Sequence, residues 1–269
     1  MKKGLVNFSA FQVAGLRLTI AGLALLPFAF KYMRQVKARD ILPLIIVAVF
    51  GNGIPYFLFA FAQTQLDSSL TGMLNSLVPL FTLLISLFVF KNPMPGLKII
   101  GVLVGLFGAV LLLSDGDGIS TGNLEFGSLV ILATICYAIS VNTLKARLTH
   151  FNPLATAAIP LLMMALPSGI IVLLTTPLSP ATYTESHWFS FVAIAVLGLI
   201  GTATALILFN RLIQLSSAVF ASSVTYLIPL FALLWGLVDG ESVFALQIIG
   251  LLLVMAAVYM INSKERKLV

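Results

Sequence analysis

The chain has 269 residues, of which 60% are hydrophobic and only 9% are charged, with a formal net charge of +6. Soluble domains carry about 25% charged residues, so this composition excludes an ordinary soluble protein and predicts an all-α integral membrane protein. The basic residues are spread thinly over short loops, which is typical of orientation signals, and we expect the lipid bilayer and no nucleic acid as a partner.

Nine apolar runs follow one another along the chain. A membrane-spanning helix needs about 20 residues, and helices satisfy every backbone group inside the bilayer. We therefore predict about nine transmembrane helices. They cover residues 9–30, 41–62, 69–90, 96–113, 126–146, 154–175, 188–212, 218–238 and 243–262.

Charges at the junctions differ between the two sides of the predicted membrane. One side has 12 basic residues: Lys31, Arg34, Lys37, Arg39, Lys91, Lys98, Lys145, Arg147, Arg211, Lys264, Arg266 and Lys267. The other side has only Lys2 and Lys3, with seven acids: Asp67, Asp115, Asp117, Glu125, Glu185, Asp239 and Glu241. The positive-inside rule then predicts a cell (inner) membrane protein with a cytoplasmic C-terminus and its N-terminus outside.

Two stretches of the chain match at a constant offset of 150 residues, 51–81 and 201–231, and each contains a Pro-Leu-Phe sequence. Five helices separate the copies, so they cross the membrane in opposite senses. Such inverted repeats are typical of secondary transporters, whose site lies between the halves near the midplane. We predict two domains, 1–114 with four helices and 126–263 with five; the alternative is chance similarity among Leu-rich helices.

The second copy carries a recognisable set of residues: Ala218-Val219-Phe220-Ala221-Ser222, Pro229, Gly240-Glu241, Gln247 and Gly250. This set resembles the EamA family of the drug/metabolite transporter superfamily. The run from Leu70-Thr71 through Pro79 to Gly101 resembles the first repeat of the same family. The resemblance implies ten helices, a central cavity, and transport of metabolites.

The sequence departs from the family pattern in two ways. Lys91-Asn92 stands where the second repeat has Glu241-Ser242, and there are nine predicted helices rather than ten. Extending the repeat backwards leaves the helix at 126–146 without a partner in the first half. We therefore expect a ten-helix fold that lacks its first helix, with a genuine nine-helix form as the alternative.

Pro79 and Pro229 lie at matching depths in their predicted helices. A proline removes one backbone N–H and frees the carbonyl four residues earlier, here those of Asn75 and Thr225. Unpaired groups at this depth need protein or water partners. We expect both helix breaks to face one shared cavity, with Asn75 and Thr225 binding the solute; the alternative is a kink sealed by neighbouring helices.

Further polar side chains lie within the predicted helices. Arg17 is costly to bury and is predicted to attract an anionic or carboxylate-bearing solute, although it could instead snorkel or pair with a carbonyl. The remaining predicted solute-binding residues could instead join helices by hydrogen bonds. They are Asn52, Tyr56, Tyr137, Asn142, Asn210 and Tyr226.

These features predict a secondary transporter that exports a small organic metabolite, amino-acid-like or otherwise polar or anionic, by alternating access. A channel or facilitator is the alternative, but no repeated polar filter occurs. An intramembrane enzyme is disfavoured because no HExxH, GxSG or deep carboxylate is present. We expect no metal and no cofactor. The sequence does not specify the solute, the coupling ion or whether two copies form a homodimer.

Overall fold

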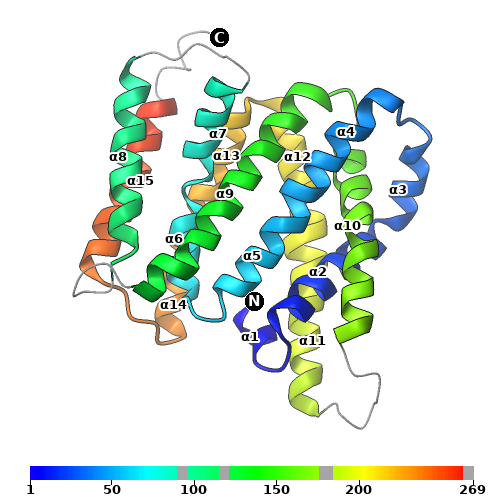
Figure 1. Ribbon diagram of the computed structural model, residues 1–269, viewed down its shortest axis with the longest axis horizontal. Coiled ribbons are helices and arrows are strands. Elements are labelled where there is room, and N and C mark those ends of the chain that lie inside the picture. The colour runs from blue at the N-terminus through cyan, green and yellow to red at the C-terminus, as the bar shows by residue number, and fades with distance from the viewer. Residues whose placement is uncertain (90–95, 115–120, 176–183, 263–269) are drawn as a thin grey trace.

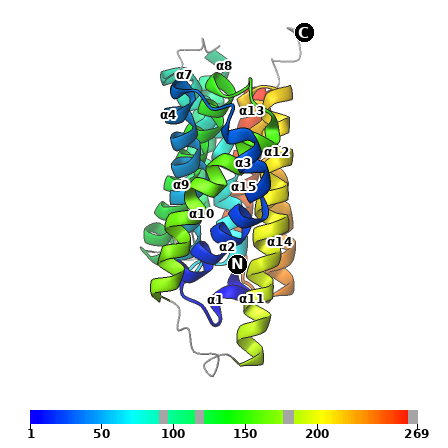
Figure 2. The ribbon, with the colours of Figure 1, turned by 90° about the vertical axis from the view of Figure 1, so that its right-hand side faces the viewer.

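The computed structural model describes residues 1–89, 96–114, 121–175 and 184–262, and its elements there are helices. The long helices lie side by side in an elongated bundle (Figures 1 and 2). Several charges used to predict the orientation lie outside the described residues. They are Lys91, Asp115, Asp117, Lys264, Arg266 and Lys267.

The first half of the chain contains eight α-helices and one π-helix among the described residues. Their bounds are α1 (Lys2–Leu5), α2 (Ala10–Ala24), α3 (Leu26–Met33), α4 (Ala38–Ile46), the π-helix η1 (Val47–Gly53), α5 (Ile54–Ala62), α6 (Ser68–Asn75), α7 (Val78–Phe88) and α8 (Gly96–Leu112).

The second half begins with a helix of 27 residues. Its elements are α9 (Thr121–Arg147), α10 (Pro153–Thr175), α11 (Glu185–Gly198), the π-helix η3 (Leu199–Thr204), α12 (Ala205–Leu215), α13 (Ala218–Ser223), the 3₁₀ turn η4 (Val224–Tyr226), α14 (Leu227–Val238) and α15 (Ala245–Asn262).

Six helical stretches of the described chain are long and apolar enough to cross a membrane, and α2 with α3 adds a seventh if the bent pair is one span. Two shorter apolar helices, Ile100–Leu112 and Ala245–Met260, accompany them. The chain is therefore an all-helical, multi-pass membrane protein, as its composition predicts. The nine predicted runs overlap these seven stretches and the two shorter helices.

Several predicted helices are broken. The run at 9–30 forms two helices, α2 and α3, which meet at 61°. Pro27 lies in the first turn of α3, where its missing N–H prevents α2 from continuing. The prediction of one continuous helix was wrong because it did not take Pro27 into account. The runs at 69–90 and 218–238 are interrupted as well, between α6 and α7 and at η4.

Close helix contacts depend on small residues. The pair α8 and α15 packs along its length at one edge of the bundle, and α2 packs on α10 at the other (Figure 1). A Cβ atom at Gly108 would lie 2.8 Å from the carbonyl oxygen of Gly250. A Cβ atom at Gly72 of α6 would lie only 2.2 Å from the Cβ of Ala232 of α14. Small residues thus bring these backbones together, as in other membrane helix pairs.

Candidate functional site

A cavity of about 760 Å³ lies within the bundle, and both halves of the chain line it. Its walls come mainly from α5, α6, α9, α12 and α14 together with both π-helices. The lining is mostly apolar, with a small number of polar side chains. This size and composition are typical of sites for small organic molecules.

Seven of the nine side chains predicted to bind a solute line this single cavity. They are Arg17, Asn52, Tyr56, Asn75, Tyr137, Asn210 and Thr225. They come from distant parts of the sequence and meet because the helices pack side by side. Their role in binding a solute stays a prediction, but their placement makes them available to one ligand.

Two of the predicted residues are not placed in the cavity wall. Asn142 is buried between helices, where its Nδ2 donates to the carbonyls of Thr82 and Ala138, both at 2.9 Å. The prediction that Asn142 lies in the solute site was wrong, because its amide joins α9 to α7 instead. The side chain of Tyr226 lies outside the described residues.

The two prolines stand just after breaks in repeat-related helices. Pro79 lies in the first turn of α7, and Pro229 lies in the first turns of α14 after the 3₁₀ turn η4. Both are buried, but neither is among the residues that line the cavity. The prediction that the prolines themselves face the cavity was therefore wrong. The breaks instead bring Asn75 and Thr225, four residues before each proline, to the wall.

The cavity wall contains a π-helix from each half. Residues 49–53 of η1 correspond to residues 199–203 of η3 at the repeat offset of 150. A π-helix widens one turn of an α-helix and occurs often at functional sites. Gly51 and Asn52 of η1 and Gly201 of η3 line the cavity, so the widened turns lie beside the space that a solute would occupy.

Arg17 brings a positive charge to the cavity. Its Nε donates to Oγ1 of Thr202 at 2.7 Å, and its Cζ lies 4.2 Å from the centroid of the Tyr56 ring. The Nη1 group contacts Sδ of Met1 at 3.7 Å. Among the described residues, no carboxylate forms an ion pair with Arg17. The contacts hold the guanidinium in place, and no carboxylate of the described residues neutralises its charge.

Two buried acceptors also lie on the wall. Oδ1 of Asn52 and Oε1 of Gln63 have no hydrogen-bond partner among the described residues. A buried acceptor without a partner costs about 1–3 kcal/mol, which a bound donor would recover. The cavity therefore combines one positive charge with two acceptors that lack donors.

Several other polar residues of the wall were not predicted from the sequence. They are Gln63, Ser68, Thr71, Ser140 and Thr156. Thr156 Oγ1 accepts a hydrogen bond from Nδ2 of Asn210 at 3.2 Å, which joins α10 to α12. Single hydroxyl residues are common inside membrane helices, so their sequence gives no signal that separates a wall position from a helix contact.

Comparison with protein families gives a match over most of the chain. The model of the EamA-like transporter family matches residues 1–114 and again residues 127–263. The two matches fall on the two halves that carry the repeat.

Similar proteins occur in bacteria and plants. The chain is 27% identical to the uncharacterized inner membrane transporter YedA of Escherichia coli, over 96% of this chain and 83% of the relative. It is 25% identical to the chloroplastic WAT1-related protein At3g02690 of Arabidopsis thaliana, over 98% of this chain and 66% of the relative. A solved crystal structure shares the fold at a TM-score of 0.66 and 18% identity, with 97% of this chain and 90% of that one covered.

Proposed function

Because the chain belongs to the EamA-like transporter family, we propose that it is a secondary transporter that carries a small organic metabolite through the central cavity by alternating access. Transport rather than enzymatic chemistry is the activity of this family. The class of solute is inferred from Arg17. This residue is a cation on the cavity wall with no carboxylate partner among the described residues.

The preferred solute bears a carboxylate or a similar anion. An ionisable side chain within the membrane is costly and commonly marks a substrate path. A carboxylate beside Arg17 would neutralise it through charge-assisted hydrogen bonds. Amine or hydroxyl groups of the same solute would donate to Asn52 Oδ1 and Gln63 Oε1, the unpaired acceptors. An amino-acid-like molecule meets both requirements, and we propose export as the direction.

The proposed architecture is an inverted repeat of residues 1–114 and 126–263, crossing the membrane as nine helices. Repeat-related spans pack on one another in three places: α2 on α10, α8 on α15, and crosswise in the third, where α6 packs on α14 and α7 on α13. This pairing is what a two-fold axis in the membrane plane produces. The matching π-helices and the two separate family matches support the same division.

We propose further that the complete fold has one more helix, the repeat partner of α9. Helix α9 packs along α5, α6 and α7, and 72% of the apolar part of Ser68–Phe88 is buried, against 31% of its counterpart Ala218–Val238. A groove lined in part by Phe231 and Trp235 follows the exposed face of α14.

If upstream codons encode an apolar helix of about 20 residues, expressing it with the chain should shield Phe231→Cys from a lipid-soluble maleimide. Unchanged labelling would contradict this placement.

The proposed setting is the inner membrane, with the C-terminus in the cytoplasm. A reporter enzyme fused after Val269 should then be active only as a cytoplasmic reporter, and one inserted at 115–120 only as an external reporter. Reporters on the same side would show that the number of spans is wrong by one.

A flux experiment tests the transport proposal. The purified protein in liposomes should take up a labelled amino-acid mixture with saturation, and unlabelled solute inside should drive counterflow. Flux that rises in proportion to concentration and lacks counterflow would indicate a channel. No flux of any carboxylate-bearing solute, with flux of neutral ones, would contradict the role of Arg17.

A further inference from the structure

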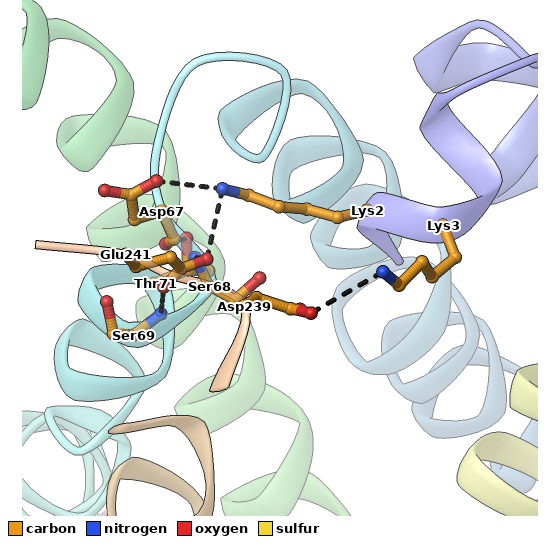
Figure 3. Close-up of polar contacts among 8 residues, drawn as sticks. All are labelled: Lys2, Lys3, Asp67, Ser68, Ser69, Thr71, Asp239 and Glu241. Atoms are coloured by element: carbon orange, nitrogen blue, oxygen red, sulfur yellow. Dashed lines mark hydrogen bonds and ion pairs between the residues drawn. The ribbon is translucent and has the colours of Figure 1, made fainter. Parts of the chain in front are cut away.

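A carboxylate from the second half of the chain binds the first turn of a helix from the first half (Figure 3). Glu241 follows α14, and its Oε1 and Oε2 accept hydrogen bonds from the backbone N–H groups of Ser68 and Ser69, both at 2.8 Å. These are the first two N–H groups of α6, which have no acceptor inside the helix. The Glu241 side chain is only 6% exposed, so it ties the end of α14 to the beginning of α6.

The local backbone directs Glu241 toward α6. Gly240 has a φ of +79°, a left-handed conformation that glycine adopts without strain. Glu241 N–H donates to the carbonyl of Gly236 at 2.8 Å, and Gly240 N–H donates to that of Leu237 at 3.3 Å. Together these bonds form the Schellman motif that ends many helices. The chain thereby leaves α14 at a defined angle, with the carboxylate at the N-terminus of α6.

Lys2 holds the same carboxylate from the other side. Its Nζ lies 2.9 Å from Oδ1 of Asp67 and 3.1 Å from Oε1 of Glu241. Asp67 is the N-cap residue of α6, yet its side chain does not cap the helix. Glu241 supplies the cap instead, while Asp67 and Glu241 both bind Lys2.

The backbones of α6 and α14 touch beneath this contact. A Cβ atom at Gly236 would lie 2.5 Å from Oε2 of Glu241 and 2.9 Å from Cβ of Ser69. Both helices also line the cavity, through residues that include Ser68, Gly72 and Trp235. Separating the Ser68 end of α6 from the Glu241 end of α14 would therefore open this end of the cavity.

The repeat does not provide the same contact at the opposite end. At the offset of 150, Glu241 corresponds to Lys91, and Ser68 and Ser69 correspond to Ala218 and Val219. A lysine has no acceptor for a backbone N–H group. Helix α13 is instead capped by its own N-cap residue, since Ser217 Oγ accepts from Phe220 N–H at 3.1 Å. Among the described residues, a carboxylate from the other half therefore caps α6 but not the repeat-related helix α13.

We propose that Glu241 is a positioning residue that latches the α1 end of the cavity shut, and that each transport cycle must release its bonds to Ser68 and Ser69. The role rests on the alternating-access function proposed above. The solute does not touch Glu241; the residue acts through the relative position of α6 and α14.

Accessibility of the cavity tests the latch without any solute. Thr71 lines the cavity and is only 2% exposed; Thr71→Cys in a Cys136→Ser background leaves one thiol, because Cys136 is the only cysteine. A membrane-impermeant thiol reagent is applied separately to right-side-out and inverted vesicles. Glu241→Gln should raise the labelling rate by about tenfold or more from the Lys2 side only, because the neutral amide has one acceptor oxygen and cannot replace both charged hydrogen bonds.

The matched control is Asp239→Asn. Asp239 lies two residues away and pairs with Lys3 of α1 at 3.5 Å, with no ion pair to α6 among the described residues, so its loss should leave the labelling rate unchanged. Glu241→Asp provides a second test in case the Gln variant does not fold. It keeps the charge but has a side chain one carbon shorter, so an intermediate labelling rate is expected.

The outcomes separate the latch from the transport function. If Glu241→Gln and Glu241→Asp both label at the parent rate, or if Asp239→Asn labels as fast as Glu241→Gln, the latch is overturned even though solute flux persists. Faster labelling of the Glu241 variants supports the latch. If the parent then carries no organic solute in liposomes, the proposed function fails, and only the finding that Glu241 holds this end of the cavity closed remains.

Discussion

The guanidinium carbon Cζ of Arg17 lies over the ring of Tyr56, 4.2 Å from the ring centroid. The two residues come from α2 and α5 and meet at the cavity wall. A cation held by an aromatic face keeps its charge available to a second partner, since the ring contributes attraction without neutralising it. This arrangement leads to the first prediction.

Arg17→Gln should raise the half-saturation concentration for a carboxylate-bearing solute by about 10- to 100-fold, the loss of about 1.5–3 kcal/mol of charge-assisted hydrogen bonding. Uptake into liposomes measures it. Arg17→Lys should retain part of the affinity, because it keeps the charge but not the flat guanidinium. Unchanged affinity in the Gln variant would remove Arg17 from the solute site.

Asn75 and Asn142 should respond differently to the same substitution. Asn75 lines the cavity, whereas Asn142 donates two hydrogen bonds between helices. Asn75→Leu should therefore reduce transport with little change in thermal stability. Asn142→Leu should lower the free energy of unfolding by about 1–3 kcal/mol because it leaves buried carbonyls with fewer donors. Thermal unfolding in detergent and liposome flux separate the two effects, and the opposite pattern would exchange their roles.

Gly72 should tolerate no side chain. A Cβ atom there would lie 2.2 Å from Cβ of Ala232, so Gly72→Val forces α6 and α14 apart. We expect lower thermal stability and faster labelling of Thr71→Cys. Gly169→Ala is the control, because its Cβ would lie 3.6 Å from the nearest atom, Oγ1 of Thr19, an ordinary contact. Equal behaviour of the two variants would show that α6 and α14 are not in contact.

The contact of Glu241 with α6 should depend on pH. Burial alone would raise the pKa of Glu241, but hydrogen bonds from Ser69 and Ser68 and from Lys2 outweigh it and lower the pKa from 4.5 to about 2. A lowered folded-state pKa stabilises the fold above the unfolded value and loses that effect as the pH falls toward the folded value. The difference in melting temperature between parent and Glu241→Gln should be full at pH 6 and should shrink between pH 4.5 and 2.

A constant difference across that range would show that Glu241 stabilises the protein through packing rather than charge. Lys2 does not confound the measurement. Although burial opposes its charged form, hydrogen bonds to Asp67 and Glu241 raise its pKa above 10.5, so Lys2 stays protonated throughout the acidic range.

Features that depend on local composition could be predicted from the sequence. Apolar run length predicts a helical membrane protein, and the placement of Asn75 and Thr225 on one cavity follows from the repeat. The break at Pro27 was missed, although its sequence signal is clear. Asn142 was predicted to bind the solute because it is a polar residue deep in a predicted helix, but depth in a helix does not show which neighbour a side chain meets.

Other features depend on contacts that no local pattern contains. The π-helices η1 and η3 differ from α-helices by a shift in hydrogen bonding, which requires no distinctive residue. Glu241 belongs to the Gly-Glu pair that carried the family resemblance, yet its partners Ser68 and Ser69 lie 173 and 172 residues away. Only the packing of α6 against α14 brings them together.

Under the proposed alternating-access cycle, the contact of Glu241 at one end of the cavity would make the empty carrier spend unequal times in its two orientations. Apparent affinity falls with the fraction of carriers that face the solute, so half-saturation should differ between the two membrane faces. The free energy of the contact cancels over a complete cycle, however, because every contact that breaks also re-forms. Glu241 can therefore change how fast solute binds at each membrane face, but it cannot set the direction of net transport. A solute that is not coupled to an ion gradient would still reach equal concentrations on both sides.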